Sequence, residues 1–214
     1  MRLRITFSKS DWLIYSSHLD LMRVWERALR RAGLPLAYSG GFNPRPKLQL
    51  ARALPLGHVG EAEILDVWLE EPVPVGNAAR MMAPVLPDGL SVKEIRQVDP
   101  RAPAMQTQVV GTVYRVIVEW DEGPEDVKAR IAQVMAADEL LHQRRGREYN
   151  LRPLIEILSL IKAAEKKITL HMGLSARPGA TGRPEAVVDV LGMGDAFARY
   201  YRERLIVSAG PEAA

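Results

Sequence analysis

Residues 2–32 read RLRITFSKSDWLIYSSHLDLMRVWERALRRA, and they join a strand pattern to a helix pattern. From Arg2 to Phe7 polar and apolar side chains alternate, which is typical of a half-buried β-strand. Ser17 then offers an N-cap, with the acidic Asp20 three residues later, and this capping pattern predicts a helix that runs to Ala32. The chain therefore begins a domain that mixes strands with helices.

The elements that follow extend this pattern to the order strand-helix-strand-strand-helix-strand. Gly33 and Pro35 end the first helix. Alternating or apolar segments predict strands at 47–53, 61–69 and 90–98, and a helical period predicts a second helix at 75–85. This order is the split β-α-β arrangement of ferredoxin-like domains. We therefore predict an α+β fold whose first domain spans residues 1–98.

The same order recurs after a proline-containing stretch, residues 99–108, which we interpret as a linker. Predicted strands at 109–120, 150–161, 167–174 and 200–207, and helices at 124–137 and 183–191, fill a second domain at 109–208. The segment 154–164 fits a helix equally well, because its apolar residues also follow a 3.6-residue period. With that segment as a strand, the chain consists of two tandem ferredoxin-like (βαββαβ) halves.

Charge is distributed unevenly along the chain. The 214 residues include 29 Lys and Arg and 26 Asp and Glu, for a net charge of +3. Residues 1–60 alone carry +7, so the remainder carries −4. Positive charge gathered at one end favours an anionic partner, and nucleic acid is the commonest large one.

Composition excludes several classes of site. The sequence has no cysteine, so disulfides, thiolate zinc sites and cysteine-ligated iron–sulfur clusters are excluded. The four histidines do not have the spacing of metal ligands. No apolar run approaches the roughly 18 residues of a membrane helix, and the first residues lack a signal-peptide core. We expect a cytoplasmic protein with no membrane partner, no metal and no cofactor.

One face of the first predicted helix carries four arginines, which we call the arginine stripe. Its members lie within about 100° of each other on a helical wheel: Arg23, Arg27, Arg30 and Arg31. Such like charges repel each other unless an anion faces them, and the planar guanidinium suits phosphate. A solvated basic face explains the stripe equally well when it is considered alone.

The segment 39–47, SGGFNPRPK, which we call the Gly/Pro loop, follows that helix. Its glycines permit close approach of a ligand to the backbone, and its prolines stiffen the chain around a cation. Phe42 offers a face on which a base can stack. The competing interpretation is a rigid connection whose Phe42 packs into the core. The loop residues that we expect at an anion or RNA site are Gly40, Gly41, Phe42, Asn43, Arg45 and Lys47.

Two further residues are weaker candidates. His18, at the start of the helix, is the only histidine that we consider as a catalytic acid or base, although a histidine there more often caps or packs. Arg152 follows a basic turn at 144–147 and is a candidate extension of the anion surface. That turn is also typical of an ordinary exposed hairpin.

The chain resembles the bacterial radical-SAM-associated (radical-SAM-linked) proteins, a family of uncharacterised function. The matching motifs are SHLDLMR at 17–23, RALRRAGLP at 27–35, YSGGFNPRPK at 38–47 and ALPLG at 53–57. NLRPLI at 150–155 resembles a weaker motif in which the family more often has Asp than Asn150. The resemblance implies an accessory role beside, or fused to, a radical SAM enzyme, and it carries over no catalytic residue.

These patterns lead to three functional hypotheses. The first is a non-catalytic accessory protein of a radical SAM enzyme that binds RNA, with tRNA as one candidate, through the arginine stripe and the Gly/Pro loop. The second is a docking module that binds the radical SAM enzyme with the same surface and has no role with nucleic acid. The third is a metal-independent ribonuclease that uses His18.

Overall fold

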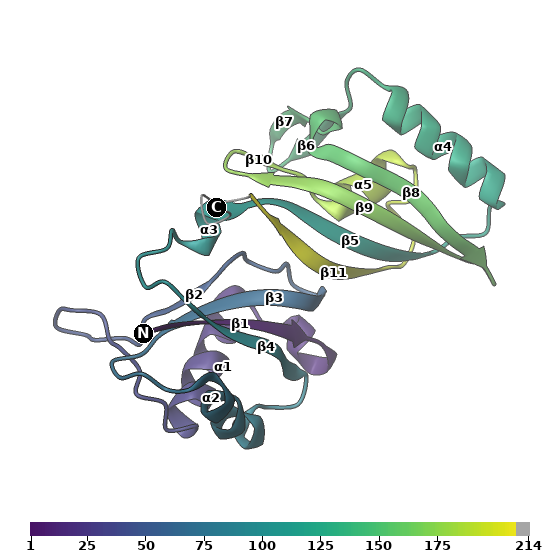
Figure 1. The fold of residues 1–214 in the computed structure, drawn as a ribbon. Coiled ribbons are helices and arrows are strands. Elements are labelled where there is room, and N and C mark those ends of the chain that lie inside the picture. The colour runs from purple at the N-terminus through teal and green to yellow at the C-terminus, as the bar shows by residue number, and fades with distance from the viewer. Residues whose placement is uncertain (209–214) are drawn as a thin grey trace. The chain divides into compact units, whose positions relative to one another are not determined.

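Antiparallel strand pairing dominates the structure, and helices complete an α+β fold, as predicted (Figure 1). The computed structural model describes residues 1–208. The chain divides into unit 1, Met1–Gln108, and unit 2, which begins at Val109 and is described to Ser208. The predicted linker, 99–108, lies within unit 1 and ends in a short helix.

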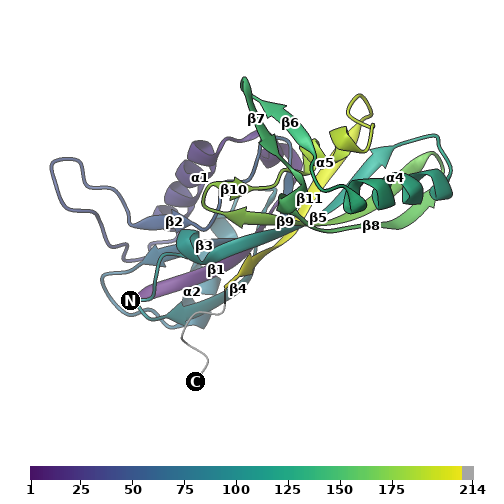
Figure 2. The same cartoon turned by 90° about the horizontal axis from the view of Figure 1, so that it is seen from above.

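Unit 1 contains the six principal elements expected for the first half. Its elements are β1 (Arg2–Lys9), the 3₁₀ helix η1 (Asp11–Tyr15), α1 (His18–Arg31), β2 (Leu48–Leu50), β3 (Val59–Trp68), α2 (Val75–Met82), η2 (Ala83–Val85), β4 (Leu90–Val98) and α3 (Met105–Gln108). The strands pair antiparallel in the order β2-β3-β1-β4 (Figure 2). The short helices η1 and α3 were not predicted.

The apolar face of α1 forms part of the core of unit 1. Trp25 and Phe7 are fully buried, and their rings meet edge to face with centroids 4.9 Å apart. Leu21 and Leu29 are buried beside them. This packing fixes the rotation of α1 about its axis, so its opposite face points to solvent.

The predicted capping pattern at the start of α1 is present as a complete capping box. The backbone N–H of Asp20 donates to Ser17 Oγ at 3.2 Å, and the backbone N–H of Ser17 donates to Asp20 Oδ2 at 3.3 Å. The Ser17 hydroxyl also donates to that carboxylate at 2.7 Å. This side-chain hydrogen bond, followed by the backbone one, holds the pKa of Asp20 below its ordinary value.

The polar side of β1 contains a buried ionic cluster that the alternation of its residues did not predict. Arg4 Nε donates to Asp66 Oδ1 at 2.8 Å, and Arg2 Nη2 donates to Asp66 Oδ2. Asp66 is fully buried and Arg2 is 1% exposed. Arg2 also donates to the carbonyl of Ala102 at 2.6 Å and lies over the ring of Trp68. Asp66 thus joins β3 to β1, and Arg2 extends the cluster to the segment after β4.

Unit 2 repeats the order of unit 1 with an inserted hairpin. Its elements are β5 (Val109–Glu119), α4 (Pro124–Ala136), β6 (Leu141–Arg144), β7 (Arg147–Asn150), η3 (Arg152–Leu154), β8 (Ile155–Ala164), β9 (Lys167–Arg177), β10 (Ala180–Thr181), α5 (Pro184–Val190) and β11 (Ala198–Val207). The long strands pair antiparallel in the order β8-β9-β5-β11. The inserted hairpin consists of β6 and β7.

Two sequence-based expectations for unit 2 are decided by strand pairing. The ambiguous segment 154–164 forms β8, because Ile155 to Ala164 pair along β9. The strand predicted at 150–161 begins later than expected, since β7 and η3 occupy its first residues. Within residues 1–208, no helix has the length and apolar composition needed to cross a membrane.

Replacing Asp66 tests the buried ionic cluster. Asp66→Ala leaves two buried guanidinium groups without their carboxylate, and we expect the free energy of unfolding to fall by about 3–5 kcal/mol. Denaturation in urea, followed by circular dichroism, measures this change. The matched control is Asp88→Ala at an exposed position, which we expect to change stability by less than about 0.5 kcal/mol. Equal effects of the two substitutions would contradict the role of the cluster.

Candidate anion-binding surface

The arginine stripe lies on the exposed face of α1, opposite its buried residues. All four arginines are exposed. Arg23 pairs with Asp20 at 3.1 Å, and Arg30 pairs with Glu26 at 2.8 Å. Exposed pairs of this kind contribute little stability, about 0–1 kcal/mol, so a stronger anion can replace the carboxylates.

The other two stripe residues, Arg27 and Arg31, differ in their surroundings. Within residues 1–208 neither has a carboxylate partner within ion-pair distance. The two arginines are also neighbours at i,i+4 on one face of α1. Both line a hollow of about 300 Å³ with Trp12, Val24 and the turn at 84–87. Like charges at this spacing repel each other. An anion bound in the hollow would relieve that repulsion.

Sequence reasoning did not find the other residues of this hollow. Trp12 comes from η1 and is 58% exposed, while the turn at 84–87 follows α2. These segments are distant in sequence, so no local pattern joins them to Arg27 and Arg31. The fold brings them together because α1 packs against the same sheet as α2.

The Gly/Pro loop is closed at its base and exposed at its tip. Ser39 N donates to the carbonyl of Arg45 at 2.8 Å, and Arg45 N donates to Ser39 Oγ at 3.0 Å. Lys47 N donates to the carbonyl of Ala37 at 2.7 Å. The segment between α1 and β2 accordingly projects as a long loop in both ribbon views (Figures 1 and 2). Its base is therefore anchored while its tip is free to meet a ligand.

The tip of the loop presents its side chains to solvent. Phe42 is fully exposed, so the interpretation that it packs into the core is wrong. Gly41 has a φ of +105°, a conformation that side-chain-bearing residues rarely adopt. Arg45 and Lys47 are exposed as well. The base of the loop meets the arginine stripe where the Arg30 guanidinium lies 5.9 Å from the centre of the Tyr38 ring.

His18 is the first residue of α1 and is partly buried. Its Nδ1 atom is buried and has no hydrogen-bond partner in residues 1–208. General acid–base catalysis by histidine ordinarily uses a partner that sets the tautomer, and the described residues provide none for His18. Among these same residues, no three His, Cys, Asp or Glu side chains lie close enough to hold a metal ion.

Arg152 is engaged inside unit 2. Its Nε and Nη2 donate to the carbonyl of Met135 at 3.1 and 2.8 Å, and its Nη1 donates to the carbonyl of Ile155 at 3.1 Å. Met135 lies in the last turn of α4, where carbonyl groups lack helical partners. The guanidinium therefore caps α4 and fastens it to β8, and we leave Arg152 out of the anion surface.

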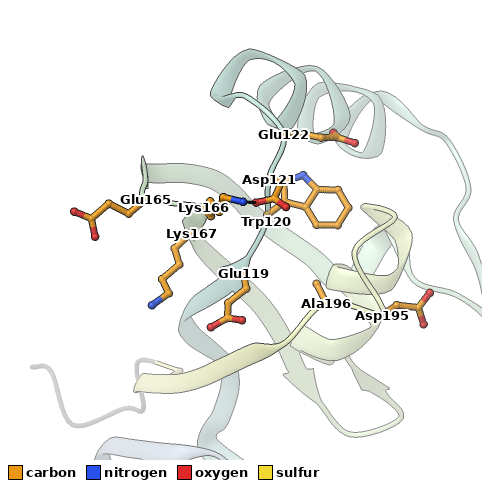
Figure 3. A pocket seen from close by; sticks show the side chains of 9 residues that line it. All are labelled: Glu119, Trp120, Asp121, Glu122, Glu165, Lys166, Lys167, Asp195 and Ala196. Atoms are coloured by element: carbon orange, nitrogen blue, oxygen red, sulfur yellow. Dashed lines mark ion pairs between the residues drawn. The ribbon is translucent and has the colours of Figure 1, made fainter.

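A different hollow in unit 2 is acidic (Figure 3). It has a volume of about 660 Å³ and lies between the end of β5, the β8–β9 turn and the start of β11. Five carboxylates and two lysines line it, and Lys166 pairs with Asp121 at 3.4 Å. A surplus of carboxylates repels phosphate. This hollow is therefore a poor site for nucleic acid.

A known protein family matches most of this chain. The family described as "Uncharacterized protein conserved in bacteria (DUF2344)" matches residues 2–184. The chain belongs to this family. This membership confirms the prediction that the chain belongs to an uncharacterised bacterial family. Nothing in the match links that family to radical SAM enzymes. No curated protein matches the chain.

Several solved structures are similar in fold to this DUF2344 protein. A chain of "Crystal Structure of a Cbf5-Nop10-Gar1 Complex" matches 95% of this chain and 48% of its own length, with a TM-score of 0.55 and 11% identity. A chain of "Structure of H/ACA RNP bound to a substrate RNA containing 2'-deoxyuridine" matches 95% and 47%, with a TM-score of 0.51 and 12% identity. The DUF2344 chain thus spans about half the length of these solved chains. Identities this low show the fold alone.

The role of Arg152 can be tested by a neutral substitution. Arg152→Met removes hydrogen bonds from a charged donor to two carbonyls, and we expect the free energy of unfolding to fall by about 1.5–3 kcal/mol. The control is Lys128→Met, which removes only an exposed ion pair on α4. Urea denaturation and RNA titration measure both variants. Weaker RNA binding by Arg152→Met with unchanged stability would show that this guanidinium binds anions instead.

Proposed function

We propose that this protein is a non-catalytic RNA-binding protein whose RNA site is the arginine stripe and the Gly/Pro loop of unit 1. The observation that carries the proposal is the position of Arg27 and Arg31, exposed beside a hollow and without carboxylate partners in residues 1–208. The unequal distribution of charge, with +7 in residues 1–60, supports the same surface.

The chemistry of the hollow suits a nucleotide phosphate. Two guanidinium groups one helical turn apart can donate parallel hydrogen bonds to phosphate oxygens. Trp12 adds an exposed aromatic face on which a base can stack. The volume of about 300 Å³ lies at the lower end of the range of ligand sites, about 300–1,000 Å³. A single nucleotide of a longer strand therefore fits better than a large ligand.

The Gly/Pro loop supplies a second contact for the same strand. Phe42 is available for stacking, and Arg45 and Lys47 are available for neighbouring phosphates. Gly40 and Gly41 allow the strand to approach the backbone, and Asn43 is exposed beside them as a polar contact. Because the base of the loop is closed by hydrogen bonds, less entropy is lost when RNA orders its tip.

The comparisons agree with this proposal at the level of fold. The similar solved chains come from a Cbf5-Nop10-Gar1 complex and from H/ACA RNP complexes, one of which is bound to a substrate RNA. We also infer that both units are ferredoxin-like, because their strands follow the same spatial order. That order is β2-β3-β1-β4 in unit 1 and β8-β9-β5-β11 in unit 2. Fold similarity alone does not determine function, so the exposed residues of unit 1 are the main support for RNA binding.

The proposed partner is a radical SAM enzyme in the cytoplasm, to which this protein would present RNA. The support is the resemblance of the motifs at 17–23, 27–35 and 38–47 to the radical-SAM-associated proteins. Substrates of such a pair would be RNA molecules held by unit 1, with tRNA as the first candidate. The ribonuclease hypothesis is not proposed, because His18 has no acid–base partner in the described residues.

Charge reversal at the hollow tests RNA binding. We expect Arg27→Glu with Arg31→Glu to weaken RNA binding about 100-fold, since each charge-assisted hydrogen bond is worth about 1.5 kcal/mol or more. The slope of log K against log salt should also fall by about one for each phosphate that the variant no longer binds. Fluorescence titration with a labelled tRNA at 50–300 mM salt measures both quantities.

The matched control for this test is Lys128→Glu with Lys166→Glu. Both lysines are exposed and lie in unit 2, and the double substitution changes the net charge by the same amount. We expect this variant to bind RNA almost as the unaltered protein does. Equal losses in the two variants would mean that overall charge controls binding, and salt-independent binding would contradict the proposal.

Removing the exposed ring of the Gly/Pro loop separates stacking from charge. We expect Phe42→Ala to weaken binding of single-stranded RNA by about 1–3 kcal/mol, the usual value of stacking one base on an aromatic side chain. Stability should change by less than about 0.5 kcal/mol, because Phe42 is fully exposed. Titration and urea denaturation of the same preparation measure the two effects. Unchanged RNA affinity would exclude Phe42 from the site.

Exposed apolar side chains support docking on a protein as a second candidate function. Tyr15, Leu19 and Leu56 are 72%, 66% and 63% exposed. Tyr15 and Leu19 lie on η1 and the first turn of α1, and the backbone N–H of Gly57, beside Leu56, donates to the carbonyl of Ile14 in η1. Co-purification with the radical SAM enzyme that survives nuclease, without any RNA affinity, would favour docking over RNA binding.

A further inference from the structure

Four arginines surround a hollow in unit 2, and none of them belongs to the arginine stripe or the Gly/Pro loop. The hollow has a volume of about 550 Å³ and lies between the β6–β7 hairpin, the β9–β10 turn and the residue before α5. The residues that matter for its chemistry are Arg144, Arg145, Arg147, Arg183, Tyr149 and Leu154. We call it the basic pocket. In the described part of the chain none of its four guanidinium groups has a carboxylate within ion-pair distance.

The hairpin concentrates this charge through a tight turn. Arg144 pairs directly with Arg147 across the two strands, so only Arg145 and Gly146 form the turn. Both turn residues have positive φ, 48° and 74°. Asparagine is the usual first residue of such a turn, and arginine there is uncommon. Three of the four residues at 144–147 are therefore arginines, whose like charges repel each other. The geometry of the turn does not require arginine at any of these positions.

The hairpin is held in place on the side away from its tip. His142 Nε2 lies 3.2 Å from Asp189 Oδ2 on α5, and the His142 and Tyr149 rings meet edge to face at 5.6 Å. Asn150 Oδ1 accepts a hydrogen bond from Leu140 N at 3.0 Å. These contacts fix the strands before any ligand arrives, so binding requires little additional ordering.

Tyr149 provides a hydrogen-bond donor that lacks an acceptor. Its hydroxyl is buried and has no hydrogen-bond partner in residues 1–208. Burial raises the pKa of Tyr149, while the nearby Arg183 and Arg144 guanidinium groups act in the opposite direction. The hydroxyl thus keeps its proton at neutral pH and lies close to two cations. A buried donor without a partner costs free energy, and an anion in the pocket can accept from it.

Two carboxylates lie near this site and limit what it can bind. The negative charges of Glu185 and Asp189 both raise the pKa of Tyr149, and Asp189 already contacts His142. The four arginines outnumber them, so the pocket retains net positive charge. A ligand with two negative charges on one group is favoured over a singly charged one, since it meets more of the guanidinium donors at once.

We infer that the basic pocket binds the terminal phosphate of a nucleotide. A terminal phosphate carries nearly two charges and three acceptor oxygens, which match the arginine cluster and the free Tyr149 hydroxyl. The volume of about 550 Å³ exceeds what phosphate alone needs and accommodates the attached nucleoside. Leu154 and the Tyr149 ring give that nucleoside apolar contacts. The nucleotide is either free or the 5′ end of an RNA strand.

The test uses the whole protein and three probes: AMP, a ten-nucleotide single-stranded RNA with a 5′ phosphate, and the same RNA with a 5′ hydroxyl. Isothermal titration measures each affinity. We expect the 5′-phosphorylated RNA to bind at least tenfold more tightly than the 5′-hydroxyl RNA if the source is an RNA end. Binding of AMP without that preference identifies a free nucleotide as the source. Absence of both effects overturns the inference.

Variants assign the effect to the basic pocket. Arg144→Gln with Arg147→Gln should abolish the tenfold preference, or AMP binding, whereas Lys128→Gln with Lys166→Gln should keep it. Arg27→Glu with Arg31→Glu should lower the affinity for both RNAs and keep their ratio, which separates this inference from the proposed function. A preference that persists in the Arg144/Arg147 variant overturns the inference.

Tyr149→Phe gives an independent readout. The free hydroxyl has no partner to lose, so its removal should leave the midpoint of thermal unfolding unchanged or raise it. The affinity for the phosphorylated probe should fall about fivefold or more, because one charge-assisted hydrogen bond is removed. A lower unfolding midpoint with unchanged affinity would show that the hydroxyl serves only the structure of unit 2, and this would contradict its role in the pocket.

Discussion

The ion cluster of Asp66 with Arg2 and Arg4 is the constraint on which unit 1 depends. A buried carboxylate between two guanidinium groups tolerates only one alignment of β1 with β3, because any shift leaves buried charges unpaired. A shift of one residue would also exchange the polar and apolar faces of β1. The cluster therefore directs Phe7 toward α1, and it holds the segment after β4 through the carbonyl of Ala102.

Burial of one helix face determines the candidate function on the other. Because Trp25 and Leu29 occupy the core, the arginine stripe must face solvent. The stripe is then divided by its neighbours. Carboxylates on α1 occupy one pair of arginines, while Arg27 and Arg31 line a hollow formed with η1 and the turn after α2. Arg27 and Arg31 are open to a ligand directly, whereas Arg23 and Arg30 must first exchange their exposed carboxylate partners.

Positive charge is concentrated at two places with different character. The surface of unit 1 combines exposed arginines with an open loop, which suits several phosphates of a strand. The basic pocket of unit 2 is concave and contains a buried hydroxyl donor, which suits a single phosphate. The acidic hollow around Asp121 has the opposite charge. Backbone contacts of the first kind position a nucleic acid, and a pocket of the second kind can distinguish its end.

The sequence by itself determined the elements whose causes are local. The capping box of Ser17 and Asp20, the apolar period of α1 and the order of strands and helices in unit 1 all follow from residues a few positions apart. The Gly/Pro loop was equally predictable from sequence, since glycine and proline determine the conformation of their own backbone.

The tertiary structure decided what depends on partners distant in the chain. Pairing with β9 made β8 a strand, although its residues also fit a helix. Two carbonyls engaged Arg152, and the packing of unit 1 left Phe42 outside the core. Folding of unit 2 joined the hairpin arginines to Arg183. Periodicity reports which face of an element is apolar, whereas hydrogen bonds and ion pairs between distant residues depend on where the whole chain places them.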